Sequence, residues 1–447
     1  MTRPAPHYEA LLARVSRRDA VVGVVGLGYV GLPLALTALD AGFPVIGFDI
    51  NPARVEAINQ AKPVIAYIGA ETMERARAGG RFEASGDFAR LAEPDVLVIC
   101  VPTPINRNRE PDLTFVVQTA ETIASALRPG QLVVLESTTW PGTTAEVVQP
   151  MLERSGLRVG REVFLAFSPE REDPGNPDFS TRTIPKVVGA DDPASRELAT
   201  KFYGQIIAKV VPVSSAAAAE AAKLTENIFR SVNIALANEL KLVYGAMGID
   251  VWEVIGAAAT KPFGYLPFWP GPGLGGHCIP VDPFYLTWKA REFGMETRFI
   301  ELAGQINTHM PRIVVDRLAE ALDRSAGRGL SGAKVLIIGA AYKRNVDDIR
   351  ESPSLTLMEL IEKRGASCDF HDPHVAEIPA TREHVALAGR RSAALTAKTA
   401  AAYDAVLVST DHDAVDYGLL AKHARLIVDT RNVFARLGLA THKVVKA

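Results

Sequence analysis

A cysteine inside a glycine-rich loop is the clearest candidate for chemistry in this sequence. The loop, Gly271–Asp282, has four glycines and two prolines in twelve positions, which excludes a helix or a central strand. Cys278 follows these glycines instead of lying in an apolar run, so a nucleophile is favoured over a small buried hydrophobe. A thiol becomes a thiolate near a cation or a base. His277 either polarises the thiol or binds backbone as a neutral side chain.

A second glycine pattern predicts a dinucleotide site near the N-terminus. Gly26, Gly28 and Gly31 follow a β-branched run at Ala20–Val25 and precede a helix-like segment and a second strand, Leu32–Leu39 and Phe43–Phe48. This order predicts a tight turn, a pyrophosphate against backbone N–H groups, and close helix–strand packing. Asp49, at the end of the second strand, should bind the ribose hydroxyls and repel a 2′-phosphate, which favours NAD over NADP. Arg54 is near enough in sequence to leave NADP open.

Three further apolar strands end in polar residues. Val96–Val101, Leu132–Glu136 and Val163–Phe167 lead to Thr103, Thr138 and Glu170, respectively. Ligands of open α/β sheets bind beyond the carboxyl ends of strands, so these side chains are candidate contacts of cofactor or substrate. A threonine here can equally cap a helix, and the acids around Glu170 can equally form a solvated turn.

One long helix is predicted between two α/β regions. Residues 215–244 contain neither glycine nor proline and end before Gly245 and Gly248; Ser214 or Ser215 should cap the start. A polar stripe runs along it at spacings of three and four, formed by Glu220, Lys223, Asn227 and Ser231. Such a stripe is often a solvent face, but the surrounding alanines and leucines favour one that lines a cleft. The apolar remainder suits a spine that pairs with a second subunit.

The C-terminal part predicts a second doubly wound half. Helices are expected at Pro283–Phe293, Arg298–Ala319 and Leu355–Lys363, a linker at Leu322–Gly332, and strands at Lys334–Gly339, Ser367–His371, Ala405–Ser409 and Leu426–Asp429. Gly339 stands alone where the first half has three glycines, so a simple nucleotide is expected here and not a dinucleotide. The predicted domains are 1–213, 214–321 and 322–447.

Composition excludes several classes of function. The 447 residues are 48% hydrophobic with a formal net charge of −2, which gives no global basic field for nucleic acid. Three cysteines make no disulfide framework and suit a reducing compartment. No apolar run approaches the length of a membrane helix, and no hydrophobic signal core is present, so a cytoplasmic protein is expected. A metal is not expected, because no second His/Cys pair stands at ligand spacing.

Taken together, these segments resemble the UDP-glucose/GDP-mannose dehydrogenases, which oxidise a nucleotide sugar twice at C6. The resemblance extends over essentially the whole chain and is carried by Gly26–Gly31, Val101–Thr103, Glu136–Thr138, Pro169–Glu170, Lys223–Asn227, Gly273–Asp282 and Ala341–Arg350. It implies an α/β fold in which two Rossmann-like domains are joined by the long helix and a helical middle region, with NAD as cofactor and a homodimer or higher homo-oligomer.

The resemblance also implies roles for individual residues. The catalytic set would be Cys278, Lys223, Asn227, Asp282, Glu170 and Thr138. Cofactor contacts would include Tyr29, Val30, Thr103, Thr138 and Arg350 besides the glycines, Asp49 and Arg54. Substrate contacts would be Glu170, Arg171, Lys223, Asn227, Gly273, Gly275, Lys343 and Arg431.

Two stretches, Ser168–Pro177 and Lys261–Gly273, are similar to the bacterial UDP-N-acetylglucosamine 6-dehydrogenases of surface-polysaccharide pathways. His277 stands where UDP-glucose dehydrogenases usually carry serine, but the gluco and manno epimers stay unresolved. Two other classes of protein are alternatives. A single-step hydroxyacid dehydrogenase would leave Cys278 and the second α/β half without a role, and a dinucleotide-binding scaffold would not need the polar stripe.

Overall fold

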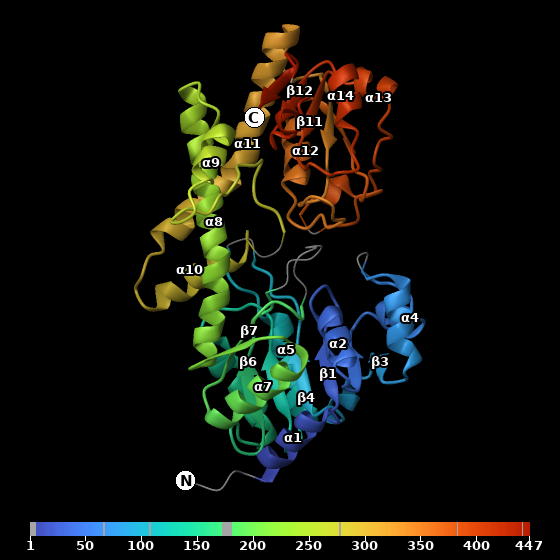
Figure 1. The fold of residues 1–447 in the computed structure, drawn as a ribbon, viewed down its shortest axis with the longest axis vertical. Coiled ribbons are helices and arrows are strands. Elements are labelled where there is room, and N and C mark those ends of the chain that lie inside the picture. The colour runs from blue at the N-terminus through green and yellow to red at the C-terminus, as the bar shows by residue number, and fades with distance from the viewer. Residues whose placement is uncertain are drawn as a thin grey trace. The chain divides into compact units, whose positions relative to one another are not determined.

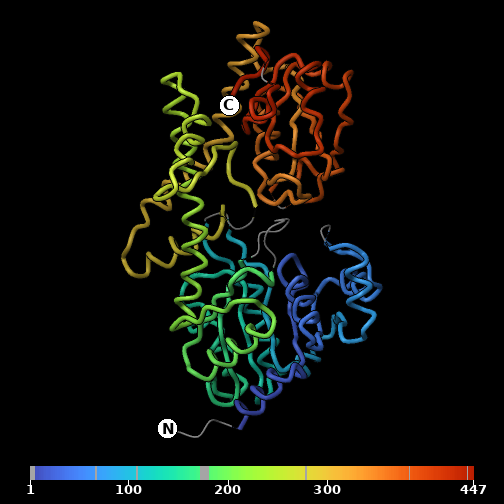
Figure 2. The backbone as a smooth tube through the Cα atoms, viewed as in Figure 1, coloured from blue at the N-terminus to red at the C-terminus, as the bar shows by residue number. Residues whose placement is uncertain are grey.

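The structure is a computed structural model and describes residues 6–65, 68–106, 109–171, 181–276, 279–381, 383–439 and 441–447. The chain divides into two compact units (Figures 1 and 2). Unit 1 comprises Met1–Glu226 and Phe284–Met295, and unit 2 comprises Asn227–Pro283 and Glu296–Ala447.

Unit 1 is built on a mainly parallel sheet. Within the described residues, eight strands pair in the order β3-β2-β1-β4-β5-β6-β7-β8, and only the β6–β7 pair is antiparallel. Their bounds are β1 Val22–Val25, β2 Val45–Phe48, β3 Phe82–Ser85, β4 Val96–Ile99, β5 Leu132–Leu135, β6 Phe164–Phe167, β7 Lys186–Gly189 and β8 Val210–Val213. β1, β2, β4, β5 and β6 are buried throughout, as expected for parallel strands covered on both faces.

Helices cover the sheet of unit 1. They are α1 Pro6–Arg17, α2 Gly31–Asp40, α3 Pro52–Asn59, α4 Ala70–Ala78, α5 Thr114–Ala126, α6 Gln149–Leu152, α7 Pro193–Ile206 and most of α10 Asp282–Glu292, with single turns at Phe88–Ala92, Thr144–Val148 and Glu153–Ser155. Side chains of α1, α2 and α7 pack on alternate strand residues, such as Val22 and Val24, in one continuous core. Sequence reasoning predicted β1, β2, β4, β5, β6 and α2, but not β3 or β7.

Unit 2 contains a second, fully parallel sheet. The described strands pair in the order β10-β9-β11-β12-β13, with bounds β9 Lys334–Ile338, β10 Ser367–His371, β11 Ala405–Val408, β12 Ile427–Asp429 and β13 Val444–Lys446. One face packs on α11 Arg298–Ala326 and α12 Pro353–Lys363. The other packs on α13 Ala397–Ala402, α14 Tyr417–His423 and α15 Val433–Arg436, and a single turn lies at Val385–Leu387. Helices on both faces confirm the predicted doubly wound architecture.

A 31-residue helix, α8 Ala216–Ala246, continues from unit 1 into unit 2, and α9 Val251–Ala258 follows it. The Ser215 hydroxyl accepts a hydrogen bond from the N–H of Ala218, so Ser215 caps the helix start as predicted. Gly245 lies within the last turn instead of ending the helix. No described helix is both long and apolar enough to cross a membrane.

The predicted linker Leu322–Gly332 is partly wrong. α11 continues to Ala326, because Leu322 is fully buried on the core face of that helix. The helix ends at Gly327, whose φ of 61° is left-handed and suits a helix C-terminus. The irregular segment is therefore only 327–333, directly before β9.

Candidate functional site

The glycine fingerprint of unit 1 forms the predicted turn between β1 and α2. A Cβ on Gly31 would lie 1.9 Å from the carbonyl oxygen of Gly26, and a Cβ on Gly26 (φ 94°) would lie 2.6 Å from that of Cys100. A Cβ on Gly28 would meet nothing within 4 Å, so this backbone is open to a ligand. No side chain caps the N-terminus of α2 at Val30; in its first turn the N–H of Leu32 donates to the carbonyl of Gly28 at 3.1 Å, and Pro33 has no N–H.

Asp49 completes this turn from the end of β2. One oxygen accepts the N–H of Leu27 and the other that of Asn51, both at 2.9 Å, which fixes the carboxylate beside the fingerprint. Arg54 forms an ion pair with Asp49 at 2.9 Å. Tyr29 and Val30 are half-buried in the same turn. A tight turn, an open backbone and a fixed carboxylate together fit an adenine dinucleotide.

Beyond the strand ends of unit 1 lie Thr103, Thr138 and Glu170, all half-buried. The carbonyl oxygen of Thr103 accepts the hydroxyl of Tyr285. Arg171 pairs with Glu226 at 2.7 Å and donates to the carbonyl of Pro185 at 2.7 Å. All three contacts lie within unit 1.

A buried charge cluster supports Glu170. The ammonium of Lys186 lies 2.9 Å from Glu136 and 3.4 Å from Glu170, so one cation serves two carboxylates. Glu136 is 1% exposed and also accepts the hydroxyl of Tyr203. Burial raises the pKa of Glu136, and the charge of Lys186 opposes this shift. Sequence reasoning missed Lys186 and Tyr203; a lysine at the start of the apolar run Val187–Val188 was the available signal.

The polar stripe of α8 is buried as a whole. Glu220 accepts hydrogen bonds from the N–H groups of Gly142 and Thr144 at 2.5 and 2.9 Å, and from the Thr144 hydroxyl. It therefore fixes a loop and does not line a cleft, contrary to the prediction for this member of the stripe. Lys223 is 7% exposed and lies one helical turn before Asn227, which is fully buried.

Both ends of the glycine loop are attached to α8. The side-chain amide of Asn227 donates to Asp282 at 2.6 Å, and the side-chain oxygen of Asn238 accepts the N–H of Gly271 at 3.0 Å. The two asparagines are eleven positions apart, about three helical turns, so they lie on one face. Asn307 of α11 supports Asn238, accepting its amide at 2.9 Å. Sequence reasoning predicted Asn227 and Asp282 but missed Asn238 and Asn307.

The described part of the loop also packs on the segment between β9 and α12 in unit 2. A Cβ on Gly275 would lie 2.6 Å from the side chain of Tyr342, and Gly276 donates its N–H to the carbonyl of Arg350 at 3.0 Å. Gly273, at φ 143°, leaves space for Pro353 and Pro311. His277 and Cys278 lie outside the described residues.

The guanidinium of Arg431 lies against Gly271, where a Cβ would be 2.8 Å away, and donates to the carbonyl of Ser409 at 2.7 Å. Arg431 also lines a cavity of about 590 Å³ with Arg344, Arg436 and two tryptophans. Trp252 and Trp269 stack there at 5.4 Å and 12°. Aromatic faces beside cations are suited to a nucleotide.

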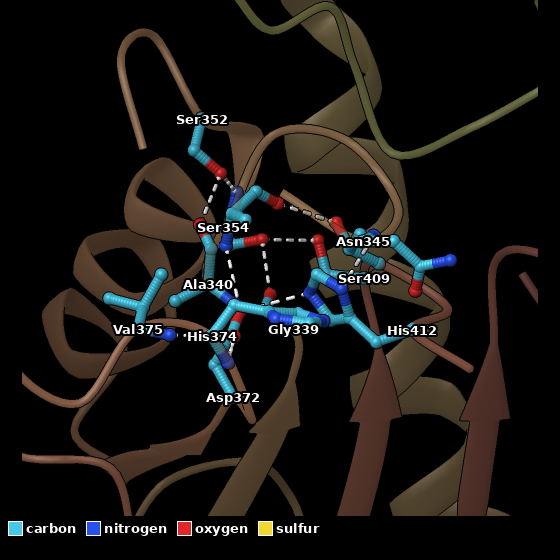
Figure 3. A network of polar contacts seen from close by, with 12 residues as sticks. Gly339, Ala340, Asn345, Ser352, Ser354, Asp372, His374, Val375, Ser409 and His412 are labelled. Carbon is cyan, nitrogen blue, oxygen red and sulfur yellow. Dashed lines mark hydrogen bonds and ion pairs between the residues drawn. The ribbon is translucent and has the colours of Figure 1, made fainter. Parts of the chain in front are cut away.

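Lys343 lies in the loop after β9, which a buried network holds in place (Figure 3). Asp372 accepts the N–H groups of Ala340 and Ala341 at 2.7 and 3.0 Å, and Nε2–H of His412 at 3.0 Å. His412 Nδ1 accepts the N–H of Asn345 at 2.9 Å, which places its proton on Nε2. Burial alone would raise the pKa of Asp372, but His412 and the N–H donors lower it to about 2.

Arg350, predicted near the cofactor, holds Asp348 with a bond of 2.6 Å. No group of three or more His, Cys, Asp or Glu side chains in the described ranges is placed to hold a metal.

Three family models match the chain in order. Residues 20–207 match the NAD binding domain of the UDP-glucose/GDP-mannose dehydrogenase family, 217–309 its central domain, and 336–436 its UDP binding domain. The chain belongs to this family. The family match confirms the resemblance found in the sequence and the prediction of NAD as cofactor. The protein is thus an NAD-dependent nucleotide-sugar dehydrogenase, and the match to the UDP binding domain supports a nucleotide sugar as substrate.

Several members of the dehydrogenase family are similar over most of their length. A UDP-N-acetyl-D-glucosamine 6-dehydrogenase of Pseudomonas aeruginosa is 37% identical over 82% of this chain and 86% of its own. A UDP-N-acetyl-D-mannosamine dehydrogenase of Pyrococcus horikoshii is 33% identical over 92% and 95%. A solved structure of a UDP-D-ManNAc dehydrogenase from the same organism superimposes with a TM-score of 0.82 at 31% identity, over 95% of this chain and 97% of that one.

The fingerprint predicts different outcomes for two alanine substitutions. Gly28→Ala adds a methyl group where nothing lies within 4 Å, so the melting temperature should stay within about one degree while NAD binding weakens at least tenfold. Gly31→Ala, whose Cβ would meet a carbonyl oxygen at 1.9 Å, should lower both the melting temperature and the affinity for NAD. Thermal denaturation and calorimetric titration with NAD test this; an unchanged NAD affinity in Gly28→Ala would contradict the assigned site.

The low pKa of Asp372 predicts an acid-sensitive unit 2. A carboxylate whose pKa is about 2 when folded and about 3.9 when unfolded stabilises the fold above pH 4, by roughly 2 kcal/mol, and loses this as pH falls through 2. Asp372→Asn should lower the melting temperature at pH 7 and flatten its decline between pH 4 and 2. Asp347→Asn, at an exposed position in the loop between β9 and α12 that Asp372 holds in place, is the control and should match wild type. Equal pH profiles for Asp372→Asn and wild type would refute the role of the network.

Proposed function

We propose that this protein oxidises the C6 hydroxymethyl group of UDP-N-acetyl-D-glucosamine to a carboxylate, in two two-electron steps, for surface-polysaccharide synthesis in the cytoplasm. The double attachment of the Gly271–Asp282 loop to α8 carries this proposal. The sequence of this loop includes Cys278, and α8 carries the buried side chains of Lys223 and Asn227 one helical turn apart. The relatives from Pseudomonas aeruginosa and Salmonella typhi, 37% and 34% identical, support the choice of sugar.

The first oxidation needs a base for the alcohol proton and a positive group for the alkoxide. We assign the first to Asp282, acting through a water, and the second to Lys223. Asn227 gives one amide N–H to Asp282 and has a second for the substrate oxygen. Thr138 contributes a hydroxyl at the carboxyl end of β5. NAD held at the fingerprint by Gly28 and Asp49 would supply the hydride acceptor for C6 in each of two rounds, so the alcohol, water and two NAD⁺ would give the acid, two NADH and two protons.

The second oxidation requires a covalent adduct. An aldehyde is a poor hydride donor, whereas the adduct of a thiol and an aldehyde donates readily. Cys278 forms the C–S bond to C6 as a thiohemiacetal, and loss of hydride turns this into a thioester. In this proposal the positive charge of Lys223 favours the thiolate form of Cys278. Water then adds to the thioester carbon and releases the Cys278 sulfur, with Glu170 accepting the water's proton.

Glu170 is suited to this role because Lys186 fixes its orientation. Lys186 and Glu136 are both at least 95% buried, so water competes little for their charges. The lysine therefore holds Oε2 of Glu170 at 3.4 Å, and Oε1 accepts the N–H of Arg171 at 2.7 Å. Each carboxylate oxygen has two lone pairs, so the fixed carboxylate can still accept a proton from the hydrolytic water. The ion pair supports the half-buried Glu170 from within the core.

The nucleotide would occupy the cavity at the strand ends of unit 2. Trp252 and Trp269 provide apolar faces for a base, and Arg344, Arg431 and Arg436 provide cations for a diphosphate. Lys343 and Arg431 would reach the sugar end, and Gly273 and Gly275 let the loop approach it.

The manno epimer is the second candidate substrate. The Pyrococcus horikoshii relative and its solved structure both carry the name of a UDP-N-acetyl-D-mannosamine dehydrogenase and cover more of this chain than the gluco relatives. UDP-glucose is less favoured, because His277 replaces the serine usual in UDP-glucose dehydrogenases.

A homodimer formed through α8 is part of the proposal. Phe229, Leu236 and Val243 are 46%, 52% and 46% exposed and follow one another at spacings of seven, so they share one helix face. A row of large apolar side chains on one exposed face is typical of a helix that packs against another subunit.

NADH yield per mole of nucleotide sugar tests the proposed reaction. Two equivalents are expected with UDP-N-acetyl-D-glucosamine, and at most one with Cys278→Ser, because the variant cannot form a thioester. Two equivalents only with the manno epimer would keep the mechanism and reject the proposed sugar. One equivalent, equal in both proteins, would contradict the mechanism.

The support of Glu170 by Lys186 predicts a slow hydrolysis step when the ion pair is removed. Glu136→Gln/Lys186→Met avoids leaving a buried charge alone, so the double variant should fold. It should form NADH rapidly for one turnover and then turn over at least tenfold more slowly than wild type. The mass of the intact protein should then be increased by one acyl group. Glu136→Gln alone keeps Lys186 beside Glu170 and is the control. A double variant without a burst would show that Glu170 is positioned by something else.

Leu236→Glu should convert the dimer into a monomer in multi-angle light scattering, because a charge in an apolar interface is costly. Leu437→Glu is a matched control, since Leu437 is also 52% exposed but lies elsewhere in unit 2. A dimer that persists in Leu236→Glu would reject α8 as the interface.

A further inference from the structure

A second polar cavity of unit 2 is lined by none of the predicted site residues. It has a volume of about 340 Å³ and is lined by Lys241 of α8, Arg317 of α11, Lys446 of β13 and Asp250, which precedes α9. Asp250, Trp252 and Lys446 also line the nucleotide cavity proposed above, whereas Lys241 and Arg317 line only this one. The cavity thus brings three cationic side chains from three elements to one place.

The positive charges of this cavity are unequally compensated. Lys446 forms an ion pair with Asp250, and Arg317 pairs with Glu320 at 3.0 Å along α11. The amino group of Lys241 is buried and has no hydrogen-bond partner in the described part of the chain. A buried ammonium without a partner is strongly unfavourable, so this group calls for an anion or must lose its proton.

The surroundings of Lys241 show the same imbalance. Burial lowers the pKa of Lys241, the charges of Arg431 and Arg317 add to this lowering, and Asp429 opposes it, so that the pKa is about 7. Asp250 is the side-chain carboxylate on the cavity wall, where Ala447 also lies, and Asp250 is engaged by Lys446.

We infer that this cavity binds a small inorganic oxyanion of the phosphate type, with Lys241 and Arg317 as its donors. A tetrahedral anion can accept from the ammonium and from the guanidinium at once, and both donors suit phosphate oxygens. A bound anion compensates the buried amino group of Lys241, which has no hydrogen-bond partner among the described residues. Binding also requires Lys241 to be protonated, so the affinity for the anion decreases as pH rises through 7.

A consequence for catalysis follows from the charge interaction between Lys241 and Arg431, and this consequence rests on the proposed function. An anion beside Lys241 offsets positive potential near Arg431, where the diphosphate of the substrate is expected. By linkage the anion should raise KM for the nucleotide sugar, and the substrate should weaken anion binding by the same factor.

Sulfate binding to the full chain, measured by calorimetry at constant ionic strength, tests the site without any assay of activity. Sulfate keeps its charge between pH 6.5 and 8.5, so a pH effect reports the protein. We expect one saturable site in wild type, at least tenfold weaker in Lys241→Met and several-fold weaker in Arg317→Met. From pH 6.5 to 8.5 the wild-type affinity should fall about tenfold or more, while Lys241→Met should show little change.

Two control variants separate this site from others. Lys363→Met removes an exposed lysine of α12, and Lys343→Met removes a predicted substrate contact; both should bind sulfate as wild type does. Absence of binding, equal binding in wild type and Lys241→Met, or loss of binding in Lys343→Met would each overturn the inference. Failure of the proposed function would appear separately, as a wrong NADH yield with sulfate binding intact.

Discussion

The geometry around the reactive loop depends on two asparagine side chains of one helix. A loop with four glycines in twelve positions has little conformational preference of its own, and ordering it costs entropy that must be offset elsewhere. Asn227 holds the last residue of the loop and Asn238 the first, and both are buried, so these hydrogen bonds do not compete with water. α8 therefore sets the separation of the loop ends, and it also carries Lys223.

In each unit an aspartate fixes the loop after the first strand, but the two loops differ in what they can bind. In both, an aspartate after the second strand of the unit accepts backbone N–H groups of the loop after its first strand: Asp49 that of Leu27, and Asp372 those of Ala340 and Ala341. In unit 1 three glycines leave that loop open to a dinucleotide. In unit 2 His412 adds a further bond to Asp372 and the whole carboxylate is used internally. This loop is thereby suited to hold Lys343 in place, and not to bind a pyrophosphate on its backbone.

Local patterns predicted much of this fold but little of its long-range polar contacts. The apolar strands and the dinucleotide fingerprint could be read from the sequence because each is a local pattern with a known period. β3 and β7 were missed because Glu83 and Lys186 interrupt their apolar pattern. The helix after Leu322 was missed because arginine, serine and glycine suggested a linker, whereas burial of that leucine decided the outcome. Asn238, Asn307 and the Lys186 cluster join segments far apart in the chain, and no local pattern specifies such partners.

The central claim is that Cys278 becomes covalently bonded to C6 of the substrate, and trapping that bond tests it most directly. Glu170→Gln, mixed with UDP-N-acetyl-D-glucosamine and NAD and quenched in acid within one turnover, should yield a peptide containing Cys278 that carries one uronyl group as a hydroxylamine-sensitive thioester. Peptides containing Cys100 and Cys368 should carry none. An unmodified Cys278 peptide from a reaction that has produced two equivalents of NADH would contradict the account.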